Sequence, residues 1–113
     1  MLQQRIKECI EACLDCVAAC HQCAASCLRE EDVNHMRKCI QTDIECATIC
    51  EATVKVMSMT GQFSSELCRI CIDACKACAD ECEKHADMGM EHCRDCAEAC
   101  RKCAHACEQM LAA

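Results

Sequence analysis

Cysteines recur along this chain at alternating gaps of three and four positions, with charged residues between them. A 3.5-residue repeat of this kind holds one set of side chains on a single face of an α-helix. Charged residues such as Glu11, Asp73 and Glu98 fall off this face, toward solvent. The cysteines are Cys9, Cys13, Cys16, Cys20, Cys23 and Cys27, then Cys39, Cys46 and Cys50, then Cys68, Cys71, Cys75, Cys78 and Cys82, and finally Cys93, Cys96, Cys100, Cys103 and Cys107.

Breaks in the repeat divide the chain into four predicted helices. Two of the breaks contain the only glycines, Gly61 and Gly89, which suit turns between helices. The predicted helices cover about 3–29, 33–57, 64–85 and 89–110. The residues expected to cap their N-termini are Asp32 or Asn34, Ser64 and Asp87.

The helical pattern is also an internal repeat, because the same cysteine spacing begins at Cys9, Cys71 and Cys96. Helices with short connections and one inward face each predict an all-α fold, an antiparallel up-down-up-down four-helix bundle with a Cys-lined core. We expect residues 1–113 to form this bundle as a single domain. The predicted helix at 33–57 has fewer cysteines, and its inward face continues through Met36, Asp43, Thr53 and Met57.

Composition narrows the function further. Cysteine supplies 19 of 113 residues, Phe63 is the sole Phe, Tyr or Trp, and the net charge of −7 argues against nucleic-acid binding. There is no run of about 18 apolar residues for a membrane span, and residues 1–20 lack the apolar segment of a signal peptide. We therefore expect a cytoplasmic protein with reduced thiols and no membrane partner. Because no phosphate loop, nucleophile elbow or HExxH motif occurs, we expect no enzyme.

Several interpretations of so many thiols differ in their chemistry. Core filling fits poorly because leucine packs better than cysteine. A disulfide framework fits poorly because the cytosol is reducing. Iron–sulfur ligation fits poorly because the cysteines that bind such clusters usually lie on loops that surround the cluster. Zinc held by four thiolates would carry a charge of about −2 per site in a dry core. Cu(I) is soft and monovalent, so one ion per thiol leaves the interior nearly neutral. The sequence therefore predicts storage of multiple Cu(I) ions, with a metallothionein-like zinc or mixed-metal buffer, or a thiol redox protein, as alternatives.

Weaker Cu(I) ligands gather where the first and third connections meet. The residues expected to form a mouth there are His35, Met36, His85 and Met88, with Met90 and His92 nearby. Thioether and imidazole bind Cu(I) more weakly than thiolate, so ions could exchange inward to the first cysteines. The alternative is that these residues are polar loop groups and gap-filling methionines.

Other positions near the cysteine face are ambiguous or structural. Asp43 is expected either as an oxygen ligand or hydrogen-bond acceptor for a thiol, or as a solvated residue or one between bundles. At the opposite end, Met57 and Met110 could also bind copper, but a hydrophobic plug is the favoured expectation. His21 and His105 lie off the cysteine face and are expected at the surface or in an interface.

Taken together, the cysteine pairs on four helices resemble the cytosolic copper storage proteins, a Cys-rich four-helix-bundle family. The resemblance rests on Cys9 to Cys27, Cys39 to Cys50, Cys68 to Cys82 and Cys93 to Cys107, and covers nearly the whole chain. It implies a homotetramer of bundles, each holding many Cu(I) ions in tetranuclear thiolate clusters, and a cytosolic role in storing or sequestering copper.

Overall fold

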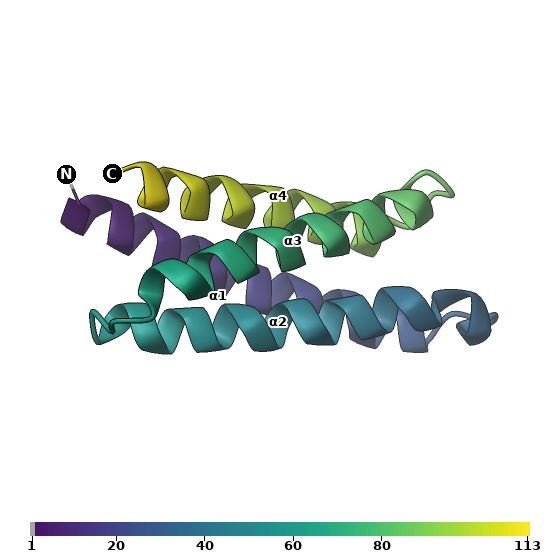
Figure 1. Ribbon diagram of the computed structural model, residues 1–113. Coiled ribbons are helices and arrows are strands. Elements are labelled where there is room, and N and C mark those ends of the chain that lie inside the picture. The colour runs from purple at the N-terminus through teal and green to yellow at the C-terminus, as the bar shows by residue number, and fades with distance from the viewer. Residues whose placement is uncertain (1) are drawn as a thin grey trace.

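Four helices run up and down in sequence order, as predicted, in the computed structural model, which describes residues 2–113. The elements are α1 (Leu2–Leu28), the short 3₁₀ helix η1 (Val33–Met36), α2 (Arg37–Ser58), α3 (Ser64–Ala86) and α4 (Glu91–Ala112). Figure 1 shows both chain termini at one end, beside the α2–α3 turn, and the other two connections at the opposite end. The bundle measures 45 × 19 × 17 Å.

Each helix packs against two neighbours, so the four helices surround a common axis. The packed pairs are α1–α2, α2–α3, α3–α4 and α1–α4. Within residues 2–113 the backbones of the diagonal pairs do not approach one another, but the Cys16 and Cys75 thiols meet across the axis at 4.0 Å. Thiols and alanines therefore occupy the space that larger aliphatic side chains fill in an ordinary bundle.

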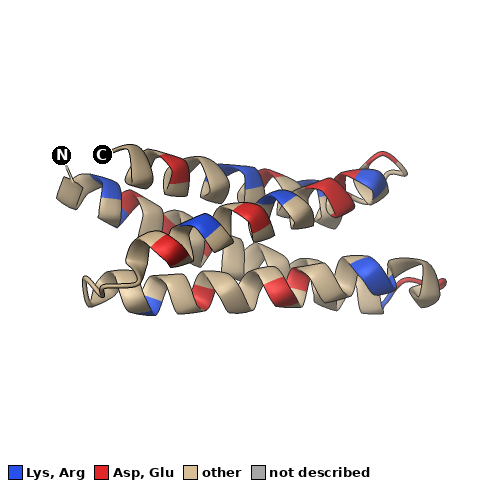
Figure 2. Ribbon diagram, in the orientation of Figure 1, with Lys and Arg blue, Asp and Glu red and all other residues tan. Residues whose placement is uncertain are grey.

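Charged residues of both signs are spread along the helices, as Figure 2 shows. They leave the inward faces to cysteine, which explains why a chain with few large aliphatic residues still forms a bundle. Within residues 2–113, no helix combines the length and the apolarity needed to cross a bilayer.

The N-caps were predicted with mixed success. Asp32 caps η1, as expected, because its carboxylate accepts a hydrogen bond from the backbone N–H of His35 over 3.4 Å. Ser64 was wrong as an N-cap, since it is the first residue of α3 and follows the cap residue Phe63. Its hydroxyl donates to the backbone oxygen of Gly61 over 2.7 Å, which fastens the turn instead.

The two tight turns explain the remaining differences. Asp87 was also wrong as an N-cap, because it ends α3, and α4 begins only after its cap residue Met90. Gly89 lies between them with φ of +92°, a conformation that favours glycine. In the α2–α3 turn the positive φ of 52° falls on Thr60. Gly61 is required there by space, since a Cβ would lie 2.7 Å from a side-chain carbon of α2.

Candidate metal centre

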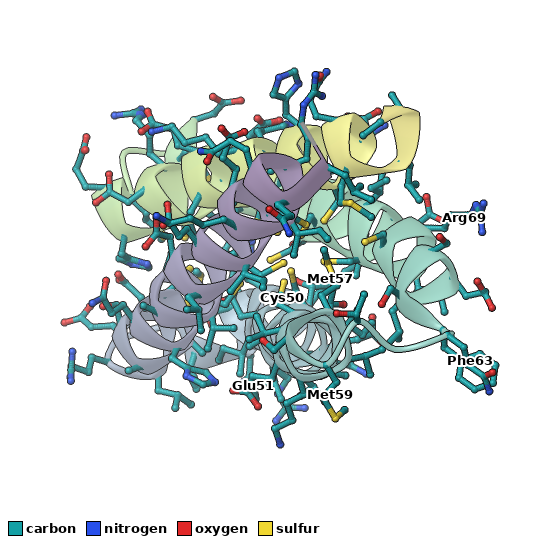
Figure 3. All side chains as sticks on the ribbon, turned by 90° about the vertical axis from the view of Figure 1, so that its left-hand side faces the viewer. Cys50, Glu51, Met57, Met59, Phe63 and Arg69 are labelled. Carbon is teal, nitrogen blue, oxygen red and sulfur yellow. The ribbon has the colours of Figure 1, made fainter. Side chains whose placement is uncertain are left out.

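Cysteine side chains from all four helices fill the bundle axis. All nineteen are free thiols, and none is more than 1% exposed. Figure 3 shows their sulfur atoms gathered between the ribbons, with Cys50 directed inward and its neighbour Glu51 outward. The 3.5-residue spacing thus places every predicted cysteine in one interior column.

Thiols from different helices lie close enough to share a metal ion. Cys16 lies 3.7 Å from Cys100, 3.9 Å from Cys46 and 4.0 Å from Cys75, so all four helices meet at one point. With a metal–sulfur bond of about 2.3 Å, as in zinc thiolates, three sulfurs around one ion lie about 4 Å apart. The spacing of the thiols therefore matches that of a metal–thiolate core without rearrangement of the backbone.

Compact groups of four thiols follow one another along the axis. The groups include Cys13, Cys71, Cys103 and Cys107; Cys16, Cys46, Cys50 and Cys75; Cys16, Cys20, Cys46 and Cys100; Cys20, Cys78, Cys96 and Cys100; and Cys23, Cys27, Cys39 and Cys93. The three middle groups share members, so a thiolate there could bridge ions in successive groups. Burial opposes ionisation of both Cys16 and Cys100, whose sulfur atoms lie 3.7 Å apart. A cation entering this core must displace a proton.

Asp43 lies inside the thiol column and is not exposed at all. Its Oδ1 accepts hydrogen bonds from Cys78 at 3.2 Å, Cys96 at 3.4 Å and Cys82 at 3.6 Å. Burial raises the pKa of Asp43 to about 11. The solvated alternative is therefore wrong, and the carboxyl group is a neutral acceptor for thiols.

The expected mouth residues separate into buried and exposed pairs. Met36 is fully buried and His85 is 3% exposed, whereas His35 and Met88 lie at the surface. The His35 ring meets the His85 ring edge-on, with centroids 5.2 Å apart. The structure therefore brings His35 and His85 into contact, buries Met36 and leaves Met88 exposed.

His85 is oriented by a carboxylate. Its Nε2 lies 3.0 Å from Oε2 of Glu81, while its buried Nδ1 has no hydrogen-bond partner within residues 2–113. Burial alone would raise the pKa of Glu81, but hydrogen bonds from His85 and Lys84 hold it below its ordinary value. A carboxylate on one ring nitrogen and a free lone pair on the other is the arrangement of many metal-binding histidines.

His92 reaches the thiols, although the sequence placed it only near the mouth. Its Nδ1 lies 3.4 Å from Cys93 Sγ and 3.7 Å from Cys23 Sγ, and its Nε2 lies 3.2 Å from Glu30 Oε1. The cysteine repeat could not single it out, because His92 precedes Cys93 by one position and so falls off the cysteine face. The remaining histidines, His21 and His105, are exposed, as predicted.

A column of buried thiols along the axis of an up-down-up-down bundle defines a class of helical proteins built to hold several metal ions in one core. Residues 2–112 match the family model described as copper storage protein, and the chain belongs to that family.

Solved structures share both fold and sequence with this chain. A cytosolic copper storage protein from Streptomyces lividans, loaded with five coppers, is 44% identical with a TM-score of 0.95 over 99% of this chain and 96% of its own. The Cu(I)-bound copper storage protein BsCsp3 is 44% identical with a TM-score of 0.88 over 95% of this chain and 98% of its own. An uncharacterised cysteine-rich protein of Bacillus subtilis, YhjQ, is 44% identical over 72 residues, 64% of this chain and 67% of its own length.

Proposed function

We propose that this chain stores Cu(I) by exchanging thiol protons for copper ions along its axis. The observation that carries the proposal is the column itself, in which thiols of different helices lie 3.3–4.0 Å apart with no exposed surface. All nineteen cysteines are the proposed ligands. The copper-loaded relatives from the same family support the choice of metal.

Charge favours Cu(I) over zinc in this core. Within residues 2–113 no Lys or Arg side chain is buried, so no internal cation can offset excess thiolate charge. A zinc ion with four thiolates leaves about two negative charges per site, and several such sites would lie next to one another. One Cu(I) per thiolate leaves no net charge, and soft sulfur ligands select it.

Storage fits the geometry better than catalysis or thiol exchange. A thiol redox protein needs an accessible thiolate of low pKa, but these thiols are enclosed. We therefore infer that the protein is not an enzyme. The description of the Streptomyces lividans relative as cytosolic supports a cytoplasmic location for this chain, where thiols remain reduced.

We propose that copper enters at the end of the bundle near His85 and His92. Both histidines hold Nε2 against a glutamate, the Nδ1 of His92 lies against thiols, and the Nδ1 of His85 is buried without a hydrogen-bond partner within residues 2–113. Met36 adds a buried thioether, while His35 and Met88 at the surface supply the outermost contacts. Because imidazole and thioether bind Cu(I) more weakly than thiolate, ions would pass from the residues at this end to the thiolates inside the bundle. Asp43 would then accept hydrogen bonds from thiols until copper replaces their protons, or bind an ion itself.

We also propose a homotetramer, the assembly that the family resemblance implies. Apolar side chains at the surface support it. The exposed Leu28, Val33 and Ile44 and the partly buried Ile40 line a surface groove that also includes Arg37 and Glu45. If two copies pair α2 antiparallel about a two-fold axis near Gln41, Arg37 of each copy lies opposite Glu45 of the other. Light scattering should give a mass above that of one 12.5-kDa chain, and Ile44→Glu should lower it.

The decisive test is an anaerobic Cu(I) titration of the fully reduced protein against a chromogenic chelator. We expect about one ion held per thiol, about nineteen per chain. Ala97, a buried non-ligand on α4, supplies the control Ala97→Ser, which should keep this capacity. Only a few coppers held, or copper released while Zn²⁺ is retained, would favour zinc buffering or redox chemistry instead.

A further inference from the structure

At the end opposite the mouth, the thiol column closes on a methionine. Met57 is 3% exposed and occupies the position where the inward face of α2 would place another cysteine. Figure 3 shows Met57 directed into the bundle, while Met59 points away from it. The Cys68 thiol donates to the Met57 sulfur over 3.5 Å. The thioether sulfur itself, and not only the methyl group, therefore faces the thiols.

Two more thiols complete this last layer. Cys9 and Cys107 lie 3.3 Å apart, and both are near enough to Cys68 to raise the pKa of its thiol. Cys9 belongs to α1, Cys68 to α3 and Cys107 to α4. Met57 is therefore the sulfur that α2 contributes to this layer. Thr53, one step earlier on α2, donates its hydroxyl to the backbone oxygen of Ile49 over 2.8 Å and is already satisfied.

We propose that Met57, Cys9, Cys68 and Cys107 form a Cu(I) site that ends the metal column, with the thioether as a neutral ligand. This inference rests on the proposed copper storage. An ion in the middle of the column has thiolates on both sides, whereas the last ion has them on one side only. A thioether adds a fourth sulfur without adding negative charge to a buried site, and it selects Cu(I) over Zn²⁺.

Hydrophobic plugging, the expectation from sequence, makes a different prediction. A methionine that only fills space has no need to present its sulfur to a thiol. Met110 provides the matched comparison, because it lies at the same end, packs against the core and is only partly buried. Replacement of either methionine by leucine conserves volume and costs less than about 1.5 kcal/mol, so both variants should fold.

The test is selenium X-ray absorption on selenomethionine-labelled full-length protein, loaded anaerobically with Cu(I). We expect a copper neighbour at bonding distance from selenium in the native sequence, weakened in Met57→Leu and unchanged in Met110→Leu. Contributions from Met36 at the mouth remain in both variants and cancel in the comparison. Met57→Leu should also lose about one tightly held copper in the chelator titration.

The outcomes that contradict the Met57 site differ from the outcome that contradicts copper storage. A selenium–copper signal that is equal in Met57→Leu and the native sequence, or that is lost only in Met110→Leu, overturns the Met57 site. The Met57 site is also overturned if the protein holds about one copper per thiol without any selenium–copper signal. Failure of the native protein to hold copper at all overturns the storage proposal instead.

Discussion

The Cys78 thiol donates to Oδ1 of Asp43 over 3.2 Å, in the middle of a core from which water is excluded. Asp43 comes from α2 and Cys78 from α3, so this contact joins two helices through a buried carboxyl group. An ionised carboxylate at this position would be costly. Its proton is therefore part of the copper-free structure.

Asp43 should make the copper-free protein less stable as pH rises. An unfolded aspartate has a pKa of 3.8, whereas burial raises the pKa of Asp43 to about 11, so only the unfolded chain releases the proton between these values. The stability is fully present below about pH 4 and declines as pH rises toward 11. Asp43→Asn should remove this decline and raise the unfolding free energy at pH 7 by about 4 kcal/mol.

Denaturant unfolding of the reduced, copper-free protein between about pH 5 and 7.5 measures this effect, below the range where free thiols ionise. Asp73→Asn, at an exposed position of α3, is the control and should behave like the native sequence. Equal pH slopes for Asp43→Asn and the native protein would show that Asp43 is ionised in the fold.

Central cysteines should matter more to copper capacity than terminal ones. Cys16 lies within 4.0 Å of thiols from all three other helices, whereas Cys27 meets Cys23 and the His92 ring. Cys16→Ala should therefore lose about two or three ions and Cys27→Ala about one, since bridging thiolates serve more than one ion. Copper-to-protein ratios after anaerobic loading and gel filtration measure the difference. Equal losses would mean that each thiol binds its ion independently.

Sequence periodicity predicted the helices and the cysteine column. In a four-helix bundle, the uncharged cysteine face of each helix must pack toward the axis, because the charged faces remain in solvent. It could not choose between a buried and a solvated Asp43, since the deciding partners lie on α3 and α4. The sequence did not predict that His92 contacts the thiols, because His92 lies beside the cysteine face of its helix. That contact depends on the path of the α3–α4 turn. That path also made Asp87 a false N-cap, since Gly89 delays the start of α4.

Removing the glycine of the α3–α4 turn should destabilise the protein, whereas adding one at Thr60 in the α2–α3 turn should stabilise it. Gly89 has φ of +92° and open space where a Cβ would lie, so Gly89→Ala adds backbone strain alone. We expect a loss of about 1 kcal/mol. Thr60 is a β-branched residue with φ of 52°, so Thr60→Gly should relieve strain of similar size. Thermal melts should move in opposite directions by about 4–8 °C, and parallel shifts would contradict this account of the turns.

Loading kinetics should reveal which end of the column receives copper. His85 presents an unpartnered Nδ1 and Met36 a buried thioether near the outermost thiols of one end. The double variant Met36→Leu/His85→Gln removes both ligands while conserving volume and a hydrogen-bond donor toward Glu81. Stopped-flow mixing with Cu(I) should show loading about tenfold slower, equivalent to about 1.4 kcal/mol in the barrier, while the final capacity stays nearly unchanged. His105→Ala, at an exposed site on α4, should load at the native rate. If the double variant also loads at the native rate, copper enters elsewhere, and the Met57 end becomes the candidate entrance.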